Sequence, residues 1–210
     1  MAEKNNNKVK QLFKDAIILT VITLTAGFSL ALLNEVTKGP IAAQAYEKKM
    51  AAYNTVFPEA KSFEEDEAAQ TLTAAAADLL STSGLGKVGV EEVLSAVDEG
   101  GNTVGFVAIA YSDEGYGGKV RISLGYDTEA KAVTKIAILE AAETPGLGAK
   151  ISEPNFYEQF TDKAVEQFVV QKGGASAEED IAAISGATIS STAVTHAVNG
   201  ALLVFEGGGK

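Results

Sequence analysis

The 210-residue sequence contains no cysteine, a single histidine (His196) and a single arginine (Arg121). Without cysteine there is no disulfide, no thiolate metal site, no cysteine-ligated iron–sulfur cluster and no thiol nucleophile. One histidine excludes a multi-histidine metal site, and carboxylates alone favour hard ions such as calcium, for which no loop has the ligand spacing. Any redox chemistry must therefore come from a bound cofactor.

Positive charge is also scarce, because the chain carries a formal net charge of -11. No basic face with interleaved aromatic residues is visible along the sequence, and a polyanion is a poor partner for an acidic protein. We therefore expect no binding of nucleic acid.

One long uncharged stretch is present, AIILTVITLTAGFSLALL at residues 16–33. Its 18 residues, at about 1.5 Å each, come close to a hydrocarbon core of roughly 30 Å and predict a transmembrane helix in contact with membrane lipid. Lysines dominate residues 1–15, so the positive-inside rule places this N-terminus in the cytoplasm and the rest of the chain outside. A cleaved signal peptide, with Ala43-Gln44-Ala45 as its cleavage site, and a buried core helix are the alternatives.

The remaining chain has an α+β pattern. Residues 34–58 predict a juxtamembrane helix, whose apolar stripe follows Gly39-Pro40 and ends at Pro58. Residues 59–205 predict an extracytoplasmic domain, and residues 206–210 a tail. Within that domain we expect a poorly specified connection at 59–89 with a short helix. The elements expected after it are hairpins at 90–113 and 119–142, a short helix at 155–160, a strand at 166–172 and a closing helix at 191–205. The two hairpins predict an antiparallel sheet with packed helices.

Three clusters of small residues interrupt this pattern: GYGG at 115–118, ETPGLG at 143–148 and ISGAT at 184–188. Glycine allows main-chain amides to approach a ligand closely, although each cluster taken singly is also typical of a turn. ISGAT precedes a predicted helix, where free amides and the helix dipole favour a phosphate. Ser190 or Ser191 as a helix cap is the simpler interpretation of part of this stretch, but it leaves the sterically open Thr188 unexplained.

These clusters, together with a single membrane helix and the tripeptide VFP at 56–58, resemble the FMN-binding domain of RnfG and NqrC, which are subunits of ion-translocating respiratory complexes. The resemblance covers most of the chain. It implies that FMN is joined through its phosphate to the Thr188 hydroxyl by a separate flavin transferase that takes FMN from FAD. It also implies that ETPGLG lines the flavin ring. The cofactor-binding residues that we expect are Thr188, Ser185, Gly186, Ala187, Glu143, Thr144, Gly146, Leu147, Gly148 and Lys150, with Lys150 balancing negative charge.

The sequence departs from this family at one position. Flavinylated members usually have aspartate six residues before the acceptor threonine, where this chain has Ala182, with Asp180 two residues earlier. Either Asp180 substitutes, or the transferase accepts alanine, or the chain is a sensor or structural module without covalent flavin. Residues 178–180 are expected to form a solvated acidic loop, His196 to be solvated, and Arg121 to be a surface or ion-pair residue.

The resemblance implies an electron-transfer subunit of an Rnf-type complex, which couples electron flow between ferredoxin and NAD to sodium or proton translocation. An NqrC-like subunit is the nearest alternative. The expected partners are the other membrane and redox subunits of the complex. The cofactor would supply the redox chemistry of this oxidoreductase subunit, so we expect no catalytic side chains and no metal.

Overall fold

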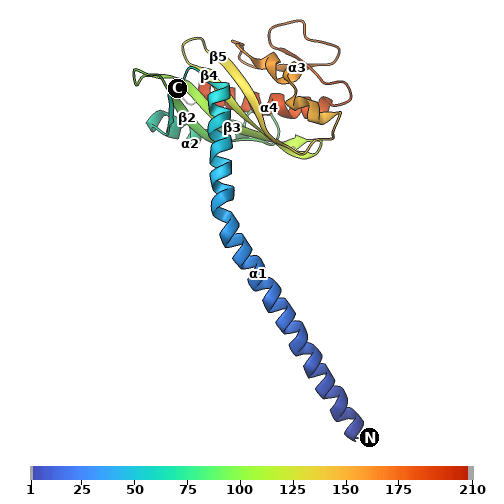
Figure 1. The fold of residues 1–210 in the computed structure, drawn as a ribbon. Helices are drawn as coiled ribbons and strands as arrows, with labels where there is room; N and C mark the ends of the chain where they lie inside the picture. Colours follow the sequence, from blue (N-terminus) through green and yellow to red (C-terminus); the bar gives the residue numbers. More distant parts are fainter. Residues whose placement is uncertain (1, 208–210) are drawn as a thin grey trace. The chain divides into compact units, whose positions relative to one another are not determined.

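The computed structural model describes residues 2–207, and side chains from residue 11 onward. The side chains of the N-terminal lysines up to Lys10 and residues 208–210 of the expected tail lie outside this range. The chain divides into two compact units, residues 1–48 and 49–210, which are described separately (Figure 1). Glu206 and Gly207, assigned to the tail above, belong to the last helix.

Helix α1, Ala2–Val56, supplies all described residues of the first unit. From Gln11 it is long and apolar enough to cross a membrane, and its large apolar side chains between Leu12 and Ile41 are exposed. The helix expected after Gly39-Pro40 is present and ends at Val56, but it is not a separate element, because α1 continues through Pro40. A proline withdraws one amide and kinks a helix, but intact turns on both sides allow the helix to continue.

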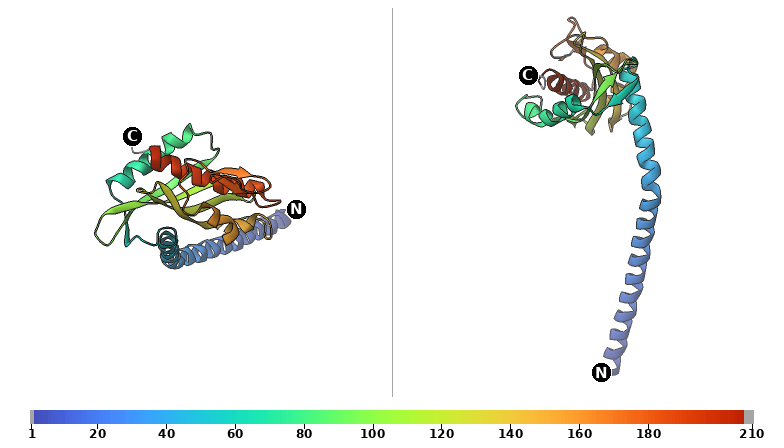
Figure 2. Two further views of the ribbon diagram at one scale, coloured as in Figure 1. Left: turned by 90° about the horizontal axis from the view of Figure 1, so that it is seen from above. Right: turned by 90° about the vertical axis from the view of Figure 1, so that its left-hand side faces the viewer.

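A five-stranded antiparallel sheet forms the centre of the second unit, with strand order β1-β2-β3-β4-β5 (Figure 2). Its strands are β1 Ser62–Glu64, β2 Val88–Val97, β3 Thr103–Gly115, β4 Gly118–Asp127 and β5 Ala132–Ala141. The two predicted hairpins are therefore confirmed, and they join into one continuous meander.

Both faces of this sheet are buried. Alternate residues of a strand point to opposite faces, so each strand contributes side chains to two cores. Val93, Ala108 and Ala110 contribute to the larger core, where α2, Glu67–Ser81, and α4, Thr188–Gly207, pack against the sheet and each other. On the other face, Leu94, Val107 and Ile109 form a smaller core with Tyr53, Val56 and Phe57. In the right-hand view of Figure 2, α2 and α4 lie on the same side of the sheet.

The interpretation of residues 59–89 as a poorly specified connection is wrong, since this region supplies β1 and α2. The Asp66 carboxylate accepts the Ala69 amide at 2.8 Å and so caps α2 at its N-terminus. Ala69, Leu72, Ala76 and Leu80 bury one face of this helix. The short helix expected in this region is confirmed, and the cap at Asp66 explains where α2 begins.

A run of short elements links the sheet to α4. It contains η1 Gly148–Ser152, α3 Pro154–Tyr157, η2 Glu158–Phe160, β6 Val169–Gln171 and β7 Asp180–Ala182. The predicted short helix and the predicted strand are both confirmed. β6 and β7 pair in parallel as a separate two-stranded sheet, and β7 leads directly into the ISGAT stretch. This arrangement brings the beginning of α4 beside the loop that follows β5.

Candidate functional site

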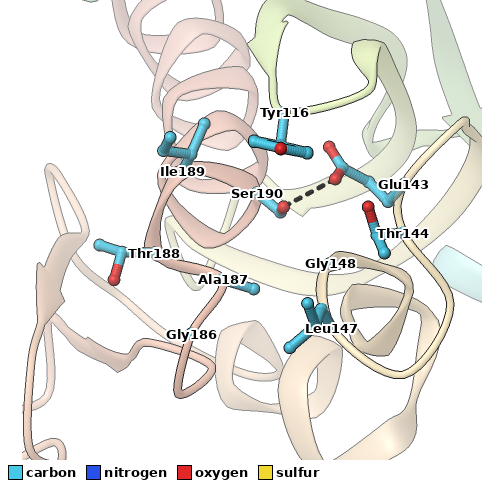
Figure 3. Close-up of a pocket in the computed structure, with 10 residues that line it drawn as sticks. All are labelled: Tyr116, Glu143, Thr144, Leu147, Gly148, Gly186, Ala187, Thr188, Ile189 and Ser190. Carbon is cyan, nitrogen blue, oxygen red and sulfur yellow. Dashed lines mark hydrogen bonds between the residues drawn. The ribbon is translucent and has the colours of Figure 1, made fainter.

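The three small-residue clusters of the sequence meet around one pocket of about 490 Å³ (Figure 3). One side comes from the loop after β5, one from the beginning of α4, and one from the turn between β3 and β4. The lining residues are Tyr116, Glu143, Thr144, Leu147, Gly148, Gly186, Ala187, Thr188, Ile189 and Ser190. Clusters separated by up to about 70 residues of sequence therefore form a single site.

A tight turn precedes α4. The Ala187 amide donates to the Ile184 carbonyl at 2.9 Å, and Gly186 has a φ of 78°. This is the position where a type II turn requires a left-handed backbone, so glycine fits without strain. The Ser191 hydroxyl accepts the Ile184 amide at 3.0 Å and donates to the Ala187 carbonyl at 3.0 Å. These two bonds hold the turn against the helix.

The beginning of α4 presents free amides to the pocket. Its first intrahelical bond runs from the Ser191 amide to the Ala187 carbonyl at 3.1 Å, so the amides of Thr188, Ile189 and Ser190 have no helical partner. Together with the helix dipole they favour an anion beside Thr188. The prediction that Ser190 or Ser191 caps the helix is wrong, because α4 begins at Thr188 and both serines lie buried within it.

Glu143 joins the three clusters. Its side chain is only 8% exposed, and its Oε2 accepts the Ser190 hydroxyl at 2.8 Å, the bond drawn in Figure 3. Its Oε1 accepts the Gly117 amide at 3.3 Å. Gly148 passes so close that an added β-carbon would collide with the Glu143 carboxylate and the Ser190 hydroxyl. A larger residue at position 148 would therefore disturb this contact.

Apolar side chains surround the opening of the pocket. Tyr116, Leu147 and Ile189 are 72%, 47% and 55% exposed, and all three line the pocket. Figure 3 shows Thr188 at the opposite end of the pocket from Glu143. An elongated ligand with an apolar ring near Leu147 and an anionic group near Thr188 fits these features, and the volume lies within the usual range for cofactor sites, roughly 300–1,000 Å³.

Most of the predicted site residues line this pocket, namely Thr188, Gly186, Ala187, Glu143, Thr144, Leu147 and Gly148. Ser185 and Gly146 lie in the turns beside it, and Ser185 is exposed. Lys150 instead lines a neighbouring pocket of about 470 Å³ together with Ala182. Sequence reasoning missed Tyr116, Ile189 and the pocket role of Ser190, although Tyr116 lies inside the GYGG cluster and could have been found there.

The segment before the turn is held by side-chain bonds. Asp180 accepts the amides of Ala177 and Ser176 and the side chain of Gln171, bonds that lower the pKa of its carboxyl group. The Asp180 carboxylate thus stabilises its own loop. Glu178 and Glu179 are exposed in the turn before β7, as expected for a solvated loop, whereas Asp180 is partly buried and begins β7. The Gln159 side chain accepts the Ala182 amide at 2.7 Å and donates to the Ala182 carbonyl at 3.4 Å.

Two further sequence-based expectations have different outcomes. His196 is half-buried, with its Nδ1 3.6 Å from Glu114 Oε2, so the expectation of a solvated histidine is wrong. Arg121 forms ion pairs with Glu91 at 2.6 Å and Glu140 at 3.3 Å, as expected. The Glu91 carboxylate raises the pKa of Arg121.

Comparisons with known proteins show which family the chain resembles. The FMN-binding domain family matches residues 115–203, which include all three clusters. Over 201 residues the chain is 36% identical to the RnfG protein of the Na⁺-translocating ferredoxin:NAD⁺ oxidoreductase complex of Acetobacterium woodii, covering 94% of this chain and 93% of that protein. It is 30% identical over 195 residues to the corresponding RnfG protein of the ion-translocating oxidoreductase complex of Methanosarcina acetivorans, covering 92% and 94% of the two chains.

Among solved structures, the chain resembles the NqrC protein of the Na⁺-translocating NADH-quinone reductase from Parabacteroides distasonis. The sequence identity is 25%, the TM-score is 0.46, and the match covers 54% of this chain and 60% of that one.

Proposed function

Because this chain belongs to the RnfG family, whose members are subunits of ion-translocating oxidoreductase complexes, we propose that it is an FMN-carrying electron-transfer subunit of such an Rnf complex. The complex would couple electron flow between ferredoxin and NAD to sodium or proton translocation. The other proteins of the complex are its partners. Bound FMN supplies the redox chemistry, and the protein binds and orients it.

The observation that carries this proposal is the pocket between Thr188 and Glu143. Free amides at the beginning of α4 favour a phosphate beside Thr188, and apolar side chains around Leu147 favour a flavin ring. The residues proposed to bind FMN are Thr188, Ser185, Gly186, Ala187, Glu143, Thr144, Gly146, Leu147, Gly148 and Tyr116. Lys150, which lines the neighbouring pocket, is proposed to add positive charge near the phosphate.

The attachment of FMN is proposed to be covalent. The Thr188 hydroxyl oxygen bonds to the flavin-side phosphorus of FAD, the phosphoanhydride bond breaks, and AMP leaves with the hydroxyl proton. A flavin transferase would catalyse this maturation step. Thr188 suits the role because it is half-buried, begins α4 and lines the pocket.

Residues 16–33 are proposed to span the membrane, with residues 1–15 in the cytoplasm and the domain of residues 59–205 on the outer face. The length and apolar surface of α1 support the anchor. The lysines before residue 16 support the orientation. Covalent attachment would then prevent loss of the cofactor outside the cell.

Ala182 favours a second candidate, a membrane-anchored protein that binds FMN without a covalent bond. Asp180 is already bonded to its own loop, so its carboxylate is not free to replace an aspartate at position 182. The two candidates differ in one property, which is whether flavin stays on the denatured chain.

A denaturing gel tests the proposal. The full chain is produced together with a flavin transferase, and the gel is viewed for flavin fluorescence. The wild-type band is expected to fluoresce, the Thr188→Val band to be dark, and the matched control Thr192→Val, four residues along α4, to fluoresce. A dark wild-type band, or a fluorescent Thr188→Val band, would contradict attachment at Thr188.

A further inference from the structure

We propose that Glu143 holds a fixed negative charge in the pocket and thereby lowers the reduction potential of the bound flavin. This inference rests on the proposed function, since it requires FMN in the pocket that Glu143 lines. It assigns to the carboxylate a role in setting the energetics of electron transfer, beyond contact with the ring.

Both oxygens of the Glu143 carboxylate accept a hydrogen bond. Oε2 accepts the Ser190 hydroxyl at 2.8 Å and Oε1 accepts the Gly117 amide at 3.3 Å. These two donors hold the carboxylate in a fixed position in the pocket.

This charge is buried without a neutralising partner. Glu143 is 8% exposed, and across residues 11–207 it forms no ion pair with a lysine, arginine or histidine. Gly115 and Gly148 enclose it from two sides, and a β-carbon added at Gly115 would lie 2.7 Å from Oε1. A buried charge with two hydrogen bonds and no counter-ion is costly to the fold, which favours a functional reason for keeping it.

The position of the charge is fixed relative to the proposed attachment point. Ser190, which is 1% exposed, donates to Glu143 from the first turn of α4, two residues after Thr188. A ligand attached at Thr188 and filling the pocket must therefore lie against Glu143 (Figure 3). Reduction places added electron density on the ring. A nearby negative charge, weakly screened in the pocket, opposes this addition.

The experiment is a redox titration of the full-length flavinylated protein in detergent, followed by flavin absorbance. Glu143→Gln keeps the size of the side chain and removes the charge, so we expect a shift to more positive potential. The expected size is at least about a tenfold change in the equilibrium constant for one-electron reduction, which is about 59 mV. Glu143→Asp keeps the charge and should remain near the wild-type potential.

Glu140→Gln is the matched control, because it removes an equal charge three residues away, from an exposed side chain paired with Arg121. Its potential should stay at the wild-type value, since exposed charges are screened by solvent. A Glu143→Gln potential within the range of this control overturns the inference. A change in potential shared by Glu143→Asp and Glu143→Gln also overturns it, because charge would not be the cause.

A second variant carries the test if Glu143→Gln does not fold. Glu143→Ala also removes the carboxylate, and it adds no group that must fit between Gly115 and Gly148. Its potential should also shift to a more positive value, and a potential within the range of Glu140→Gln overturns the inference. Fluorescence on a denaturing gel reports the Thr188 bond separately, so failure of the proposed function is distinguishable from failure of this inference.

Discussion

Asn199 on α4 offers a test of how the elements beside the site are held together. Its side chain is 4% exposed, accepts the Phe168 amide at 2.8 Å and donates to the Phe168 carbonyl at 2.9 Å. Phe168 is buried directly before β6, so this amide connects α4 to the segment that leads into the site. Asn199→Ala removes both partners at once. Each orphaned backbone group costs about 1–3 kcal/mol, so the expected loss of stability is about 2–6 kcal/mol.

The loss is measured by urea unfolding of the full-length protein in detergent, followed by circular dichroism, with Thr192→Ala as the control. Thr192 is a half-buried polar residue on the same helix, and its truncation should change stability by less than about 1 kcal/mol. At roughly 2–4 °C per kcal/mol, the melting temperature of Asn199→Ala should fall by at least about 4 °C. A loss no larger than that of the control would refute the structural role of this amide.

Gly186→Ala should lower stability by about 1 kcal/mol, because position 186 has a φ of 78°, and a melting temperature equal to wild type would contradict the turn geometry. Burial, and then the hydrogen bond to Glu92, raise the pKa of Tyr53 above its ordinary value. The neutral phenol therefore contributes fully to the stability of the fold below about pH 10, and this contribution to stability is lost as the pH rises further. Tyr53→Phe should therefore reduce the alkaline fall in melting temperature, and an unchanged fall would contradict this. Ser176→Cys places a single thiol on an exposed loop of a chain that has no cysteine. A membrane-impermeant maleimide should label this thiol in intact cells. Labelling only after lysis would reverse the proposed orientation.

The elements with local signals could be predicted closely from the sequence. Valine and isoleucine recur along the strands from β2 to β5, and turn residues such as Gly100 and Gly101 separate the strands, so the hairpins could be located within a few residues. The small-residue clusters likewise identified most of the pocket, because glycine permits close approach of the backbone to a ligand.

The errors in prediction have tertiary causes. Ser190 has the residue type of a helix cap, but its hydroxyl donates to Glu143, which is 47 residues away in the sequence. His196 was expected to be solvated, but its Nδ1 lies 3.6 Å from Glu114 Oε2 on the distant strand β3. Pro40 has the residue type of a helix terminator, but α1 continues through it. Partners distant in sequence decided the first two cases, and these are invisible to a local pattern.

The attachment of FMN to the Thr188 hydroxyl is the central claim. The most direct measurement is mass spectrometry of the denatured, proteolysed full-length protein after production with a flavin transferase. We expect the peptide containing ISGAT to be heavier by FMN less one water, and fragmentation to assign this mass to Thr188. An unmodified peptide, or the added mass on Ser185, Ser190 or any other residue, would contradict the claim.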